Sequence, residues 1–80
     1  MFSIVIPTYN RPDALERTVG SILSLSISGE YEIIIVNDYP EIPIRSFTDK
    51  RIIVINNEKN LGRSKSRNIG AQSANYNILF

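Results

Sequence analysis

Three short runs of β-branched residues, each apolar almost throughout, constrain the fold of this 80-residue chain more than any other feature. They occupy residues 2–6, 31–36 and 51–55. A strand with one wet face alternates apolar and polar residues, whereas a strand covered on both faces does not alternate. The runs therefore predict buried strands of a parallel sheet. A fourth strand is expected to begin near Asn77.

The segment after the first run has the spacing of a helix with one buried side. Asn10 is expected to cap this helix, and Pro12 suits its first turn. The apolar residues lie at offsets of zero, four, seven and eight, which places them on one face of a helix: Leu15, Val19, Ile22 and Leu23. The sequence thus predicts a helix between the first two strands.

A second helix is expected from Arg63 to about Ser73, where small residues recur on one stripe. Gly70 lies inside this segment, although a helix-interior glycine costs about 1 kcal/mol relative to alanine. A close approach of the helix backbone to the sheet accounts for Gly70 better than helix propensity does.

The order strand, helix, strand, strand, helix, strand predicts an open, parallel, Rossmann-like α/β sheet with right-handed crossovers. We expect the strand order 3-2-1-4, because the two helices then cover opposite faces. Ligands bind at such a switch point, beyond the carboxyl ends of the strands. The residues expected there are 7–11, 37–40 and 57–63.

Composition excludes several functions. Without Cys or His there is no disulfide framework, no imidazole base and no His-ligated zinc. A net charge of +1 gives no broad positive field for binding DNA. No apolar run approaches the roughly 18 to 20 residues that span a bilayer, and no signal-peptide pattern begins the chain. A cytoplasmic location is therefore expected.

The expected crevice carries an aromatic ring, a carboxylate and a basic cluster instead of a glycine-rich phosphate loop. Tyr9 can stack on a nucleobase, and Asp38 can accept hydrogen bonds from a base or from ribose hydroxyls. A separate basic cluster near the second helix can hold an anion; it comprises Lys59, Arg63, Lys65 and Arg67. Together these residues predict a site for a nucleoside diphosphate.

Three blocks of sequence resemble the N-terminal third of family-2 glycosyltransferases, which have the GT-A fold. They are Ser3-Ile4-Val5-Ile6-Pro7-Thr8-Tyr9-Asn10-Arg11, then Ile35-Val36-Asn37-Asp38, then Asn60-Leu61-Gly62 with Ser66-Arg67-Asn68-Ile69-Gly70. Their order and spacing fit the family as well. The resemblance covers nearly the whole chain.

This resemblance implies that the matching positions bind the nucleotide of a nucleoside-diphosphate sugar, usually a uridine one. Pro7, Thr8 and Tyr9 would line the base, and Asp38 would bond the base or ribose. Arg67 would lie near the diphosphate, while Asn60 would either bond a phosphate or shape the helix entry. The acceptor would be a glycan, lipid or other hydroxyl compound.

The chain departs from the family pattern at two places. After the second strand, Asn37 replaces an Asp and Tyr39-Pro40 replaces Gly-Ser, which leaves the loop conformation and nucleotide preference open. The family's Asp-x-Asp metal motif normally follows the fourth strand, so residues 1–80 are expected to be a nucleotide-binding part truncated before it. Mg or Mn is expected for the full-length enzyme, with ligands outside this chain. No catalytic or metal-binding residue is assigned, and the chain alone is expected to be inactive.

Other interpretations stay open at this point. Asp38 could cap a turn, Tyr9 could serve packing, and Pro7 could simply end a strand. The chain could be a nonenzymatic nucleotide- or RNA-binding module, or a structural remnant of a truncated transferase. The outer strand is an unpaired edge through which copies could associate. The full-length protein could lie at the cytosolic face of a membrane.

Overall fold

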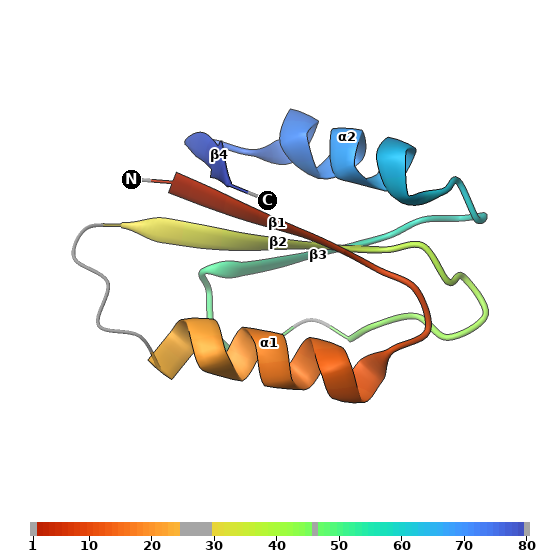
Figure 1. Cartoon of the computed structure of the whole chain (residues 1–80), viewed down its shortest axis with the longest axis horizontal. Helices are drawn as coiled ribbons and strands as arrows, with labels where there is room; N and C mark the ends of the chain where they lie inside the picture. Colours follow the sequence, from red (N-terminus) through yellow and green to blue (C-terminus); the bar gives the residue numbers. More distant parts are fainter. Residues whose placement is uncertain (1, 25–29, 46, 80) are drawn as a thin grey trace.

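The computed structural model describes residues 2–24, 30–45 and 47–79, and these residues form one four-stranded sheet. Its strands are β1 (Phe2–Thr8), β2 (Tyr31–Asn37), β3 (Ile52–Asn56) and β4 (Asn77–Leu79), in the order β3-β2-β1-β4 (Figure 1). All neighbouring pairs are parallel. The predicted fold class and strand order are confirmed.

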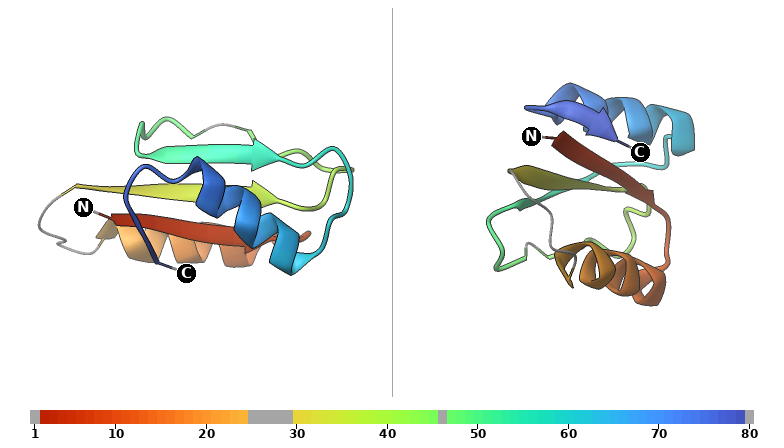
Figure 2. Two further views of the ribbon diagram at one scale, coloured as in Figure 1. Left: turned by 90° about the horizontal axis from the view of Figure 1, so that it is seen from above. Right: turned by 60° about the vertical axis from the view of Figure 1, so that its left-hand side comes forward.

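Helices α1 (Pro12–Ser24) and α2 (Arg63–Ser73) cover opposite faces of the sheet, as Figures 1 and 2 show. Strand β2 is central, so both of its faces are covered and all seven of its residues are buried. Side chains of α1 and the sheet form the main core: Leu15, Val19, Tyr31, Ile33, Ile35 and Ile52. The apolar run from Ile33 to Val36 in β2 is therefore explained by the burial of both faces of this strand.

Gly70 allows α2 to approach the other face of the sheet closely. A Cβ atom built at this position would overlap Cγ1 of Val5 and would lie 3.1 Å from Cγ2 of Val36. Both valines belong to neighbouring strands, so the helix backbone rests directly on the sheet. The predicted reason for an interior glycine is confirmed.

The start of α1 differs from the expectation by one residue. The Leu15 N–H donates to the Arg11 carbonyl at 3.0 Å, which makes Arg11 the capping residue and Pro12 the first helical one. Asn10 adopts a positive φ of 50° instead. Asn tolerates this left-handed conformation better than most residues, so it turns the chain out of β1 rather than capping the helix.

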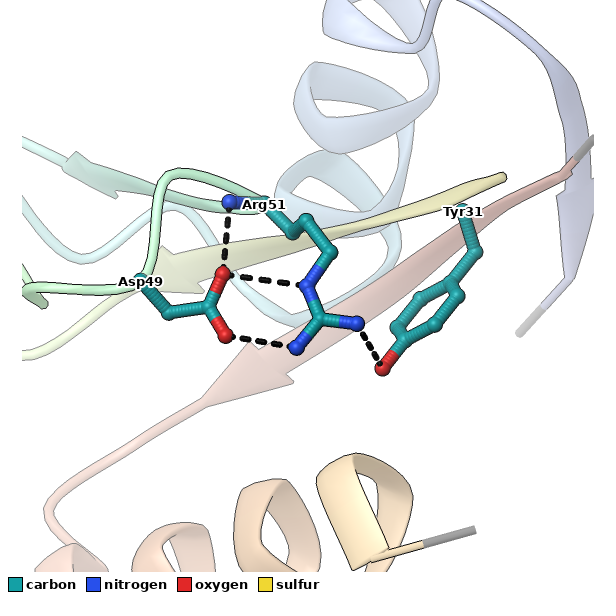
Figure 3. A network of polar contacts seen from close by, with 3 residues as sticks. All are labelled: Tyr31, Asp49 and Arg51. Carbon is teal, nitrogen blue, oxygen red and sulfur yellow. Dashed lines mark hydrogen bonds and ion pairs between the residues drawn. The ribbon is translucent and has the colours of Figure 1, made fainter. Parts of the chain in front are cut away.

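A charged network fixes the amino ends of β2 and β3 (Figure 3). Two Arg51 nitrogens, Nε and Nη2, donate to the Asp49 carboxylate at 3.1 and 2.7 Å, and Nη1 donates to the Tyr31 hydroxyl at 2.8 Å. Hydrogen bonds from the Arg51 side chain are the main reason that the pKa of Asp49 is lowered to about 2. The network joins the turn before β3 to the first residue of β2.

Glu32 is a buried carboxylate that joins β2 to the segment after α2. Its Oε2 accepts hydrogen bonds from the Ser3 hydroxyl at 2.6 Å and from the Asn75 backbone N–H at 2.7 Å. Its Oε1 accepts from Asn75 Nδ2 at 3.0 Å. Ser3 in turn accepts from the Tyr76 backbone N–H at 3.2 Å. This network, called the Glu32 clamp below, sets where the chain leaves α2 and enters β4.

Candidate functional site

A pocket of about 470 Å³ lies beyond the carboxyl end of β1, between the starts of α1 and α2. Among the described residues, β4 pairs with Phe2, Ser3 and Ile4 in the first half of β1, and the pocket lies at the other end of β1. The lining residues are Ile6, Pro7, Thr8, Tyr9, Arg11, Ala14, Leu15, Thr18, Asp38, Asn60, Gly62, Arg63 and Ser66.

Five of the six residues predicted to bind the nucleotide line this pocket: Pro7, Thr8, Tyr9, Asp38 and Asn60. They come from three segments that are far apart in the sequence. The sixth, Arg67, is exposed on α2 and does not belong to the pocket wall. Arg63, one helical turn before it, does.

Arg11, which the sequence placed at the expected crevice, lines the pocket. Sequence reasoning missed the contribution of α1, whose residues Ala14, Leu15 and Thr18 line the same pocket. Counted from Arg11, these three residues lie at offsets of three, four and seven, which places them on one side of the helix. That spacing is visible in the sequence, but only the docking of α1 on the sheet shows that this side borders the pocket.

Asp38 directly follows β2 and is 4% exposed. Its Oδ1 accepts hydrogen bonds from the Leu61 backbone N–H at 2.7 Å and from Asn57 Nδ2 at 3.0 Å. Its Oδ2 accepts from the Gly62 backbone N–H at 2.9 Å. Asp38 therefore anchors the loop before α2, and we call this arrangement the Asp38 clamp.

Burial by itself raises the pKa of Asp38, and it is the largest single influence on that carboxyl group. Hydrogen bonds from Leu61, Asn57, Gly62 and Ser66 act in the opposite direction, and together they hold its pKa below the ordinary value. The pocket consequently contains a fixed negative charge at neutral pH.

Gly62 turns the anchored loop into α2. Its φ of 92° lies in a region that residues with a side chain rarely adopt. While its N–H donates to Asp38, its carbonyl accepts the first helical hydrogen bond from the Ser66 N–H at 3.0 Å. The first turn of α2 contains no acidic residue, and Arg63 stands there beside the pocket.

Tyr9 lines the pocket, and its ring packs against the ring of Tyr39. The rings of Tyr9 and Tyr39 lie edge to face, with centroids 5.1 Å apart and planes at 85°. Tyr9 is 51% exposed, which leaves much of its ring available to a ligand. An exposed aromatic ring beside a pocket is suited to stacking on a planar group.

The described residues offer no cluster of three side chains that could hold a metal ion. Asp38, the one acid in the pocket wall they form, already accepts several N–H hydrogen bonds. Among the described residues, the pocket wall thus offers a single acidic side chain, whose oxygens are already engaged. Neither helix of the described residues is long and apolar enough to cross a bilayer.

Comparison with known proteins gives a consistent result. The model of the family described as "Glycosyl transferase family 2" matches residues 3–80. The chain is 45% identical over 75 residues to the uncharacterized glycosyltransferase YwdF of Bacillus subtilis, covering 90% of this chain and 28% of that protein.

Two further relatives carry the same description. An uncharacterized glycosyltransferase of Haemophilus influenzae is 34% identical over 76 residues, covering 92% of this chain and 26% of that protein. Another, from Methanocaldococcus jannaschii, is 41% identical over 76 residues, covering 85% and 26%. The chain thus spans about a quarter of the length of these relatives. Because the family model matches residues 3–80, nearly the whole chain, this chain belongs to glycosyl transferase family 2.

Proposed function

We propose that this chain forms the nucleotide-binding part of a glycosyltransferase. The whole enzyme would transfer a sugar from a nucleoside-diphosphate sugar, of the uridine type, to a hydroxyl acceptor such as a glycan or lipid. One observation carries the proposal: a single pocket is bordered by an exposed aromatic ring, a buried carboxylate and two arginines.

The nucleoside is proposed to lie at the side formed by the β1 and β2 ends. Tyr9 supplies the stacking surface, and Pro7 and Thr8 line the wall beside it. Base–aromatic stacking is worth about 1–3 kcal/mol per base. Asp38 presents a fixed negative charge to the N–H or hydroxyl donors of a base or ribose.

The diphosphate is proposed to lie toward α2. Arg11, directly before α1, and Arg63, the first residue of α2, both border the pocket. One guanidinium about 4 Å from a phosphate gains up to about 4 kcal/mol per unit charge at an effective dielectric constant near 20, before desolvation is subtracted. Asn60 lines the same region. Arg67 stays a proposed diphosphate contact that would act from the next turn of α2.

The transfer step is proposed for the whole enzyme and not for this chain alone. A general base must be able to take up a proton from the acceptor hydroxyl. Asp38 is a poor base because hydrogen bonds hold its pKa below the ordinary value. Mg²⁺ or Mn²⁺, held by residues outside this chain, is proposed as the cofactor of the whole enzyme, where a divalent ion would supply Lewis-acid chemistry. A place at the cytosolic face of a membrane is a further part of the proposal.

Isothermal titration calorimetry with UDP, ADP, GDP and inorganic pyrophosphate tests the proposal. We expect the chain to bind UDP. We expect Arg63→Gln to weaken binding by about tenfold or more, since a hydrogen bond to a charged group contributes about 1.5–3 kcal/mol and 1.4 kcal/mol corresponds to about a factor of ten. Arg17→Gln is the matched control, because it removes the same charge from an exposed position of α1 outside the pocket wall.

Two results would contradict the proposal. The first is no binding of any nucleoside diphosphate. The second is tighter binding of single-stranded RNA than of UDP, with an affinity that falls steeply with salt. Such a salt dependence reports the release of counterions from many phosphates and would favour an RNA-binding module.

A further inference from the structure

Tyr39 contacts the pocket only through another residue. Its ring packs edge to face against Tyr9, 5.1 Å between centroids. Tyr9 borders the pocket, whereas Tyr39 is partly buried and does not belong to the pocket wall. The described geometry therefore makes Tyr39 a support for the Tyr9 ring.

The loop that carries Tyr39 is fixed by Asn37, the last residue of β2. Asn37 is 2% exposed, and its Oδ1 accepts a hydrogen bond from the Tyr39 backbone N–H at 3.0 Å. Its Nδ2 donates to the Ile42 carbonyl at 3.0 Å. The Ile42 N–H donates to the Tyr39 carbonyl at 3.3 Å, closing a four-residue turn with Pro40 at its second position. Proline is favoured there because its φ is already set.

Asn56, at the end of β3, holds the far end of the same loop. Its Oδ1 accepts from Asn37 Nδ2 and from the Ile44 N–H, both at 2.9 Å. Its Nδ2 donates to the Ile44 carbonyl at 3.0 Å. Residues 39–44 are thus tied to two adjacent strand ends, and the Tyr39 side chain starts from a fixed backbone.

We propose that Tyr39 is a positioning residue that holds the Tyr9 ring as a preformed stacking surface for the nucleobase. This inference rests on the proposed function and deepens it. A half-exposed ring loses rotational freedom when a base stacks on it. A neighbour that restricts the ring beforehand reduces this loss and so raises affinity. Asn37 and Tyr39-Pro40 depart from the family pattern together, and Asn37 holds the turn that carries Tyr39 and Pro40.

The test compares two probes, UDP and inorganic pyrophosphate, on variants of the full chain. We expect Tyr39→Leu to weaken UDP binding about three- to tenfold, the range of a lost aromatic pair, and to leave pyrophosphate binding unchanged. Tyr39→Phe keeps the ring and is expected to bind both probes like the wild type. Equal loss for both probes would overturn the inference, because it would indicate general damage to the pocket.

A double-mutant cycle shows whether Tyr39 acts through Tyr9. In a Tyr9→Ala background, Tyr39→Leu is expected to have no further effect on UDP affinity, because the ring that it positions is gone. Independent, additive losses would mean that Tyr39 touches the nucleotide itself, and the inference would be wrong.

Controls separate the inference from the proposed function. Wild-type chain that binds no UDP overturns both, whereas wild-type binding that Tyr39→Leu leaves unchanged overturns only the inference. Should Tyr39→Leu melt below the assay temperature, Tyr39→Met carries the same comparison, because methionine fills irregular space with little strain.

Discussion

Each end of helix α2 is held by a carboxylate. One belongs to Asp38, which directly follows β2, and the other belongs to Glu32, which lies within β2. At the start of α2, Asp38 accepts the backbone N–H groups of Leu61 and Gly62. At its end, Glu32 accepts the backbone N–H and the side-chain amide of Asn75. Both carboxylates are buried, and hydrogen bonds outweigh burial and lower the pKa of each.

The two ends differ in what surrounds the clamp. The Asp38 clamp lies in the wall of the pocket, beside Tyr9 and Arg63. The Glu32 clamp lies at the opposite end of the sheet, where β1 and β2 begin and β4 follows α2. A buried carboxylate with N–H partners is therefore not by itself a sign of a ligand site in this protein. The neighbouring groups are the reason that a binding role is proposed for Asp38 and not for Glu32.

The largest effect is expected for Asp38→Asn. The amide keeps the shape of the side chain but turns an NH₂ group toward N–H donors, and each unsatisfied buried group costs about 1–3 kcal/mol. Both the free energy of unfolding and the UDP affinity should fall. Urea titration and calorimetry measure the two quantities. A variant that lost stability but kept full UDP affinity would remove Asp38 from the binding site.

Glu32→Gln is the matched change at the other end of α2. It places an NH₂ group among the donors of Ser3 and Asn75, and we expect it to lower the free energy of unfolding by about 1–3 kcal/mol. UDP affinity, measured well below the melting temperature, should stay within about twofold of the wild type, a change under 0.5 kcal/mol. A large loss of affinity would show that the two ends are coupled.

Gly70→Ala tests the close contact between α2 and the sheet. The added methyl group would overlap Val5 Cγ1, and overpacking of this kind costs about 1–3 kcal/mol. The gain in helix propensity, about 1 kcal/mol, offsets part of this cost, so we expect a net loss of about 1 kcal/mol in urea unfolding. Gly20→Ala is the control, because a Cβ there meets nothing within 4 Å. It should stabilise the chain.

The smallest effect is expected from mild acid. Because the pKa values of Asp38 and Glu32 are lowered in the folded state, their contribution to stability is complete above their ordinary values of 3.8 and 4.5. That contribution is lost as the pH falls through the lowered values. The free energy of unfolding should be flat from pH 7 to about pH 5 and then decline. Glu32→Gln should make the decline shallower, and an unchanged slope would contradict the assigned role of Glu32.

Sequence pattern was sufficient for the architecture. Residues 31–36 are apolar after their second position, and the strand that contains them is buried along its whole length. Gly70 marked the close contact of α2 with the sheet. The parallel order followed because right-handed crossovers leave few ways to connect such strands.

The pocket wall was predicted where it consists of strand ends and the residues that follow them, and was missed where it depends on how the helices are placed against the sheet. Thr8 and Asp38 belong to strand ends that meet at one edge in any parallel sheet. Arg63 and Arg67 lie one turn apart on nearly the same side of α2, because four residues at about 100° each make little more than one full turn. Which of them borders the pocket therefore depends on where the helix begins along its axis, since one turn advances it by about 5.4 Å. The Asp38 clamp fixes the first residues of α2, and Arg63 rather than Arg67 joins the wall.

The order of apolar runs and small residues alone determined a parallel sheet, two covering helices and a polar rim, because these follow from local periodicity and burial. Tertiary structure alone decided that Tyr39 supports Tyr9, that Asp38 holds Leu61 and Gly62, and that Glu32 holds Asn75. Those contacts join residues from separate segments. Hydrogen-bond and ring-contact geometry depends on positions within a few tenths of an ångström, which periodicity does not specify.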